Sequence, residues 1–197
     1  MTSSPDFVVP AYDDRSLADV LPAVARALGH PLESDTERGE APGLAFPEAR
    51  SYVVLLVDGL GEQLLAAHPD DAPFLASLLP DAQPATAGVP STTATSLTSL
   101  GTGMTPSRHG MVGFTSRIPG TDQLLQALRW NKNVSSQDWQ PHPTVFGRLS
   151  ARGVHTVNVT KREFVGSGLT DVSTRGAEAV GADAGDDRTP AANPLVE

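Results

Sequence analysis

The feature that most constrains this chain is an uninterrupted apolar run, Tyr52–Val57, which ends abruptly in Asp58-Gly59-Leu60-Gly61. A continuous run of β-branched and aliphatic residues is typical of a strand that is covered on both faces of a parallel sheet. The helical pattern of Glu62–Ala67 follows the turn and completes a strand–turn–helix unit. Such a unit places the last residue of the strand at the carboxyl edge of the sheet, where ligands bind. The pattern therefore predicts a central parallel strand with Asp58 at its functional end.

Helical and strand patterns alternate along the rest of the chain and predict an α/β fold with a mostly parallel sheet flanked by helices. Helices are expected at residues 17–28, 62–67, 73–79 and 143–151 and after Pro90, and strands at 52–57, 82–89 and 154–159. We assign residues 1–175 to the α/β domain. Residues 176–197 carry five acidic residues against one arginine and few large apolar ones, so this tail is expected to be loop or disordered.

Composition excludes several classes of function. The chain has 14 basic and 23 acidic residues and a net charge of -9, which disfavours nucleic-acid duplexes and anionic membranes as partners. It has no cysteine, so disulfides and thiolate metal sites are excluded. No apolar run is long enough to span a bilayer, and the first ten residues lack the pattern of a secretory signal. We therefore expect a soluble, cytoplasmic protein.

Two groups of residues have the chemistry of a site, and each also has a structural explanation. Asp58 is either the cap of the following helix or a metal ligand at the sheet edge. The hydroxyl cluster Ser91–Thr93 is either a helix cap or a nucleophile placed where free backbone N–H groups favour a phosphoryl group. A threonine hydroxyl needs a base or a metal to become nucleophilic, and a metal would link Thr93 to Asp58. Spacing alone leaves both alternatives open.

The segment from Pro90 to Gly110 carries a more specific pattern. It contains a Pro-x-x-Thr element (Pro90–Thr93), then Thr102-Gly103, then Pro106-Ser107-Arg108-His109-Gly110. In this order and at these separations the segment resembles the nucleophile region of type I phosphodiesterase/nucleotide pyrophosphatases, which belong to the alkaline phosphatase superfamily. The strand ending in Asp58-Gly59 is similar to the family's first metal-ligand motif. The resemblance covers about residues 52–114 and extends more loosely to residues 166–168.

The resemblance implies an alkaline phosphatase-like fold and a site with two divalent metal ions, usually zinc. By its motif Asp58 would be a metal ligand, and Thr93 would be both the nucleophile and a metal ligand. Thr92 and Ser91 are the alternative nucleophiles if the register slips. Ser96 stands where eukaryotic members have an oxyanion-binding asparagine, and one hydroxyl donor makes it a candidate for that role.

Other residues of the pattern have structural roles by the same resemblance. Gly103, Pro106, His109 and Gly110 would shape the loop after the nucleophile helix, and we do not interpret His109 as a ligand. Trp130-Asn131 lies in a long polar loop, where these residues are either loop anchors or a wall of the substrate cleft.

The later metal ligands of the family are not identified in this sequence. No Asp-His pair occurs, and the last histidine is His155. We therefore expect an incomplete, amino-terminal portion of a metal-dependent phosphodiesterase or nucleotide pyrophosphatase. Its substrate would be a small phosphodiester or nucleotide. The alternatives are a phosphomonoesterase or phosphomutase of the same superfamily, and a non-catalytic fragment or binding relative.

Overall fold

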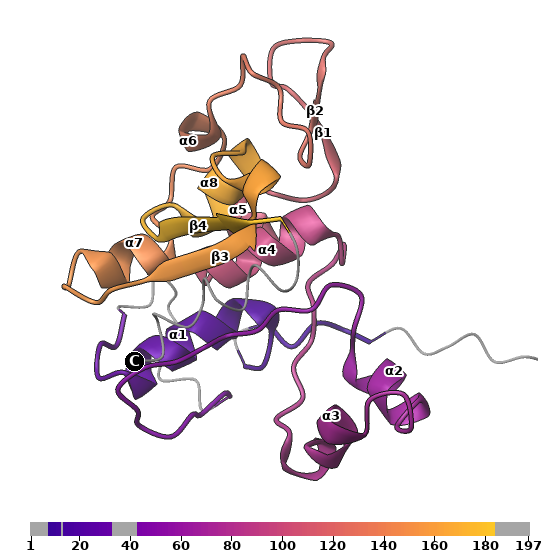
Figure 1. Ribbon diagram of the computed structural model, residues 1–197. Coiled ribbons are helices and arrows are strands. Elements are labelled where there is room, and N and C mark those ends of the chain that lie inside the picture. Colours follow the sequence, from indigo (N-terminus) through magenta and orange to yellow (C-terminus); the bar gives the residue numbers. More distant parts are fainter. Residues whose placement is uncertain (1–7, 13, 33–42, 184–197) are drawn as a thin grey trace, which may run out of the picture.

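The computed structural model describes residues 8–12, 14–32 and 43–183 (Figure 1). The described helices are α1 (Leu17–Ala27), α2 (Glu62–Ala67), α3 (Pro73–Ser77), α4 (Thr93–Thr102), α5 (Pro106–His109), α6 (Ser136–Trp139), α7 (Val145–Ser150) and α8 (Gly168–Thr174). The strands are β1 (Thr115–Arg117), β2 (Leu124–Gln126), β3 (Val157–Lys161) and β4 (Glu178–Ala182), and short 3-10 turns lie at Leu79–Asp81 and Arg162–Phe164. None of these helices is long and apolar enough to cross a membrane.

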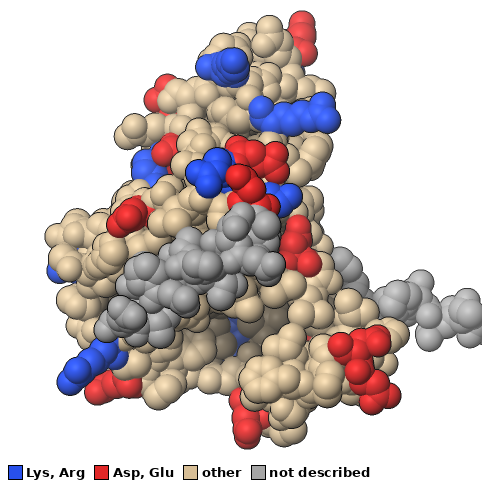
Figure 2. Space-filling model, in the orientation of Figure 1, with Lys and Arg blue, Asp and Glu red and all other residues tan. Residues whose placement is uncertain are grey.

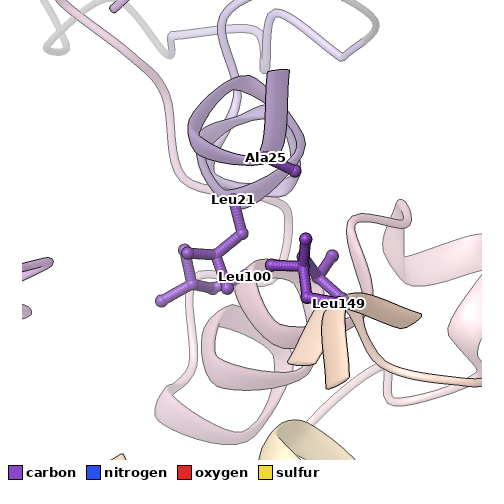
Figure 3. Packing of buried hydrophobic residues seen from close by; sticks show 5 residues of the cluster. Leu21, Ala25, Leu100 and Leu149 are labelled. Atoms are coloured by element: carbon purple, nitrogen blue, oxygen red, sulfur yellow. The ribbon is translucent and has the colours of Figure 1, made fainter. Parts of the chain in front are cut away.

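Helix α4 is the centre of the packed part of the molecule, where it contacts α1, α5, α7 and α8. On one side it packs on α1 and α7 through a cluster of buried apolar side chains (Figure 3), which are Leu21, Ala25, Leu100, Val145 and Leu149. On the other side it packs on α8 and the hairpin region through Ala94, Met111, Ala127, Leu169 and Val172. The core is therefore helical and is built from small and medium-sized side chains.

Helix α4 is rich in small and hydroxyl residues, which is explained by its close packing against α8. A Cβ atom on Gly101 would lie 1.6 Å from the backbone oxygen of Ser173, so α4 and α8 approach each other more closely than any larger residue permits. The hydroxyls of Thr98 and Thr102 donate to the carbonyls of Ala94 and Thr98, at 2.8 and 2.7 Å. Their polar atoms are thereby satisfied inside the helix interface, which allows hydroxyl residues to be buried.

The sheets are small. Strands β3 and β4 pair in parallel from Val157 opposite Glu178 to Lys161 opposite Ala182, and α8 connects them. Strands β1 and β2 form an antiparallel hairpin, which Figure 1 places at the far end of the molecule from α1. The described residues therefore form a mixed helix-and-sheet fold that is consistent with an α/β chain.

The prediction for the amino-terminal helix is confirmed. Ser16 precedes α1, and the Asp19 carboxylate accepts hydrogen bonds from the Ser16 backbone N–H and hydroxyl, at 2.9 and 2.6 Å. Gly29 ends the helix in the left-handed region at φ 79°, a conformation that glycine adopts without steric cost.

The prediction of a central strand at Tyr52–Val57 is wrong. These residues belong to no helix or strand, and all of Val53–Val57 are exposed (Figure 1, purple). The apolar pattern indicates that the segment can be buried on two faces. In the structure, however, no other described segment pairs with the run or covers it. We call residues 51–85 the open lobe, because none of them is buried.

Two further sequence expectations are corrected. Residues 82–89 form no strand, and only Thr86 makes an isolated parallel bridge, to Ser16. The tail expectation is wrong for Glu178–Ala182, which is strand β4, because β3 supplies the hydrogen-bonding edge that this weakly apolar segment needs. The rest of the tail, residues 184–197, lies outside the described residues.

Candidate nucleophile and metal-ligand site

The two residues that the motif singles out lie together at the start of α4. The Thr93 hydroxyl donates a hydrogen bond to Oδ2 of Asp58, with 3.3 Å between the oxygens, although 35 positions separate the residues in sequence. Thr93 is the first residue of the helix and is half-buried, while Asp58 is exposed. The proximity expected from the shared motif is therefore present, and the roles of both residues stay predictions.

Asp58 is positioned by a glycine turn. Gly59 adopts φ 74°, so the chain reverses immediately after Asp58, and Gly61 then begins α2 as its N-cap. Nothing lies within 4 Å of a Cβ built on Gly59, so this glycine is required by its backbone conformation and not by crowding. The glycine of the Asp-Gly pair is thus explained by the turn that the chain makes after Asp58.

Thr93 is positioned by its neighbour. Thr92 is the N-cap of α4, and its Oγ1 accepts a hydrogen bond from the backbone N–H of Thr95 at 3.3 Å. The hydroxyls of Thr92 and Thr95 also lie 3.0 Å apart. Thr92 therefore caps α4, and a helix cap was one of the two roles that the sequence left open for Ser91–Thr93. Ser91 is exposed and precedes the helix.

The first turn of α4 presents donors beside Thr93. The backbone N–H groups of Thr93 and Ala94 are not engaged by any residue in the described part of the chain. Ser96 follows Thr93 by three positions and so lies on the same side of the helix, half-buried. Free N–H groups at a helix N-terminus favour a negatively charged group.

The loop behind the site is fixed by a buried histidine. His109 is 1% exposed; its Nε2 lies 2.8 Å from the Ser99 hydroxyl, and its Nδ1 accepts from the backbone N–H of Met111 at 3.0 Å. Burial lowers the pKa of His109 from 6.5 to about 4, so the ring is neutral near pH 7. With Nδ1 accepting, Nε2 carries the proton and donates to Ser99. His109 thus ties α5 to α4.

The other loop residues of the motif have matching geometry. Gly103 and Gly110 end α4 and α5 with φ of 70° and 75°, and Pro106 occupies the first turn of α5. These residues shape the loop after α4.

A metal site is only partly provided. Asp58 and Thr93 offer two oxygen donors, which suit a hard or borderline divalent cation. Within residues 8–12, 14–32 and 43–183 there is no group of three or more His, Cys, Asp or Glu that could hold an ion. The described residues thus fit one side of a single-ion site and do not fit a two-ion site.

One further spacing was not among the expectations from the sequence. Asp138 and His142 form an Asp-x-x-x-His, the kind of pair that binds a metal from one helical turn. Asp138 lies in α6, whereas His142 lies after the helix, where its backbone N–H is held by the Gln140 side chain at 2.6 Å. Neither residue belongs to a described group of three ligands.

Trp130 and Asn131 are held within their own loop. The Trp130 Nε1–H donates to the Val134 carbonyl at 2.9 Å, and the Asn131 amide donates to the Leu124 carbonyl at 3.2 Å. The Trp130 ring also lies against Gly168, where a Cβ would stand 2.1 Å from it. These contacts are those of loop anchors, and a role in the substrate cleft stays a prediction.

Comparison with known proteins identifies a family to which the chain is similar. The family model described as type I phosphodiesterase / nucleotide pyrophosphatase matches residues 52–188, which is more than half of the chain and extends well beyond the motif region. No curated protein and no solved structure matches the chain.

Proposed function

The chain belongs to the type I phosphodiesterase / nucleotide pyrophosphatase family, and from this premise we propose that Thr93 is the nucleophile of a metal-dependent phosphodiester hydrolase. The family is a family of hydrolases that act on phosphodiester bonds of small phosphodiesters or nucleotides. We further propose that the chain contributes to an alkaline phosphatase-like domain. The observation that supports the assignment is the contact between Thr93 Oγ1 and Asp58 Oδ2 at 3.3 Å.

The geometry at the start of α4 suits attack on phosphorus. The Asp58 carboxylate accepts the hydroxyl hydrogen of Thr93 and so orients the oxygen. The N–H groups of Thr93 and Ala94, which no described residue engages, and the positive end of the helix dipole favour a phosphoryl group at the same place. Ser96 adds one hydroxyl donor for the charge that develops on the phosphoryl oxygens.

The proposed reaction has two steps. The bond from Thr93 Oγ to phosphorus forms as the bond from phosphorus to the leaving alcohol breaks, giving a threonine phosphodiester. Water then cleaves this ester and restores the hydroxyl. A divalent cation held by Asp58 and Thr93 would lower the pKa of the hydroxyl and neutralise the phosphate charge.

The experiment is hydrolysis of bis-p-nitrophenyl phosphate with added zinc. We expect Thr93→Ala to abolish turnover and Thr93→Ser to retain part of it, since only the latter keeps a hydroxyl. Ser91→Ala is the matched control and should keep the wild-type rate. Equal activity in the wild type and Thr93→Ala would move the assignment to Thr92 or Ser91.

The same assay distinguishes a phosphodiesterase from a phosphomonoesterase or phosphomutase. Preference for p-nitrophenyl phosphate over the diester would favour the phosphomonoesterase or phosphomutase alternative. The absence of turnover of either ester, with a folded protein and zinc present, would favour a non-catalytic fragment or binding relative.

A further inference from the structure

An amino-terminal strap, by which we mean the described part of residues 10–16, contacts the loop that leads into α4. The Thr86 N–H of this loop donates to the Arg15 carbonyl at 2.8 Å, and the Thr86 carbonyl accepts from the Leu17 N–H at 2.9 Å. The Thr86 hydroxyl accepts from the Ala11 N–H at 2.8 Å. The strap therefore holds Thr86 through both backbone groups and through the side chain.

Tyr12 of the strap holds the same loop closer to the helix. The Val89 N–H donates to the Tyr12 hydroxyl oxygen at 2.9 Å. Gly88 is buried beside this contact, and a Cβ built on it would lie 3.1 Å from the Tyr12 hydroxyl oxygen and 3.1 Å from Cγ of Pro106. The Tyr12 side chain and α5 therefore enclose the loop from two sides.

The Tyr12 contact lies a short way along the chain from Thr93. Three residues, 90–92, separate Val89 from Thr93, so their Cα atoms are at most about 14 Å apart even if the chain is fully extended. Pro90 further limits this connection, because its ring fixes φ. An anchor at Val89 therefore restricts where the first residue of α4 can lie.

The strap is continuous with the packed part of the molecule. It leads directly into α1, and α1 packs on α4 through Leu21 and Leu100 (Figure 1). The strap thus holds the segment before α4, while the helix that follows the strap holds α4 itself. Two attachments from one stretch of chain fix the start of α4 to the core.

Asp58, the other residue of the site, is held differently. It lies in the open lobe, where no residue is buried. Figure 2 shows acidic side chains at the rim of this lobe and no basic ones on the face shown, and residues 51–85 contain no Lys or Arg. No Lys or Arg of the lobe therefore fixes the Asp58 carboxylate by an ion pair. The contact between Asp58 and Thr93 thus depends on how firmly Thr93 is held.

We propose that Tyr12 is a positioning residue, whose hydroxyl acts through Val89 to hold Thr93 beside Asp58. The proposal rests on the proposed function of Thr93 as the nucleophile. Tyr12 lies outside residues 52–188, which the family model matches, so this role belongs to the chain's own amino-terminal segment. Attack on phosphorus is sensitive to such an anchor, because a small displacement of a reacting atom lowers the rate by a large factor.

The two tyrosines of the chain provide a matched pair of variants. Each has a hydroxyl that is hydrogen-bonded to the main chain, since the Tyr52 hydroxyl donates to the Pro47 carbonyl in the open lobe. Tyr12→Phe and Tyr52→Phe each remove one hydroxyl and keep the ring. We expect both variants to fold, with melting temperatures close to that of the wild type.

Hydrogen exchange followed by NMR measures the anchor without turnover. In Tyr12→Phe we expect the Val89 amide to exchange about tenfold faster, and the first-turn amides of Thr95 and Ser96 to exchange faster as well. Amides at the carboxyl end of α4 should be unaffected, and Tyr52→Phe should leave all of these rates unchanged. Faster exchange confined to Val89, or no change at all, would overturn the proposal.

Kinetics with bis-p-nitrophenyl phosphate and saturating zinc measure the consequence for the nucleophile. We expect Tyr12→Phe to lower kcat about tenfold and to leave KM within about twofold, because the geometry of attack changes and substrate binding does not. Tyr52→Phe should match the wild type in both constants. An unchanged kcat in Tyr12→Phe would overturn the proposal.

Failure of the proposed function gives a different result. Turnover that Thr93→Ala does not lower, or no turnover by the wild type, would overturn the role of Thr93 as nucleophile. The exchange measurement would then still decide whether Tyr12 holds the start of α4.

Discussion

The packed region around α4 and the open lobe contain the same kinds of apolar side chain, but these are buried in the packed region and exposed in the open lobe. In the packed region Leu100, Val145 and Leu149 are at most 9% exposed, because helices distant in sequence converge on α4. In the open lobe Leu55 and Phe74 are 81% and 73% exposed, and α2 and α3 have no buried residue. An apolar pattern therefore encodes what a segment can bury, while its neighbours decide whether it is buried.

The largest expected contrast between the two regions comes from a pair of glycines. Gly101→Ala should prevent α4 and α8 from packing and cost more than about 3 kcal/mol, because the added Cβ meets the Ser173 backbone at 1.6 Å. Gly61→Ala in the open lobe adds a Cβ to open space and should cost well under about 1 kcal/mol. Urea unfolding of both variants, followed by circular dichroism, measures the difference. Equal losses would mean that the lobe packs in solution.

Truncation of apolar side chains should separate the regions next. Leu149→Ala removes a side chain from the cluster between α1, α4 and α7 and should lower the free energy of unfolding by about 3 kcal/mol. Phe74→Ala should change it by less than about 0.5 kcal/mol, since the ring is already in water. Thermal unfolding monitored by calorimetry distinguishes these values. A loss of similar size for Phe74→Ala would contradict the comparison.

A third contrast depends on pH. Because burial lowers the pKa of His109 to about 4, the unfolded chain binds a proton between pH 6.5 and 4 that the folded chain does not. The free energy of unfolding should therefore be highest above about pH 6.5 and fall by up to about 3 kcal/mol as the pH drops to 4. His109→Gln should flatten this part of the profile. A profile unaffected by His109→Gln would argue against the buried neutral ring.

The smallest expected contrast concerns hydroxyl groups. Thr92→Ala removes the N-cap of α4 and should cost about 1 kcal/mol. Ser77→Ala removes an exposed hydroxyl that donates to the Phe74 carbonyl, and should cost a few tenths of a kcal/mol at most. Chemical denaturation of both variants at pH 7 checks the order. A larger loss for Ser77→Ala would show that the open lobe is the more cooperative region.

The sequence predicted what depends on local pattern. Helical spacing and a capping pair located α1, and the order of the motif brought Asp58 and Thr93 together across 35 positions. The sequence did not predict which segments of the chain pair or pack with each other. Residues 52–57 have the sequence pattern of a central strand, but no described segment pairs with them. Strand β4 has only a weak strand pattern, but it pairs with β3. The hydroxyls of Thr98 and Thr102 donate to carbonyls of their own helix, which allows them to be buried in the fold.

The parallel pair β3–β4 with α8 between them has a consequence for the order of folding. These three elements are contiguous in sequence, from Val157 to Ala182, so their contacts close only short loops. The contact of α1 with α4 closes a much longer loop, which costs more chain entropy before any contact is gained. We expect the β3–α8–β4 unit to be structured in the folding transition state and α1 to dock later, with φ-values near zero along α1.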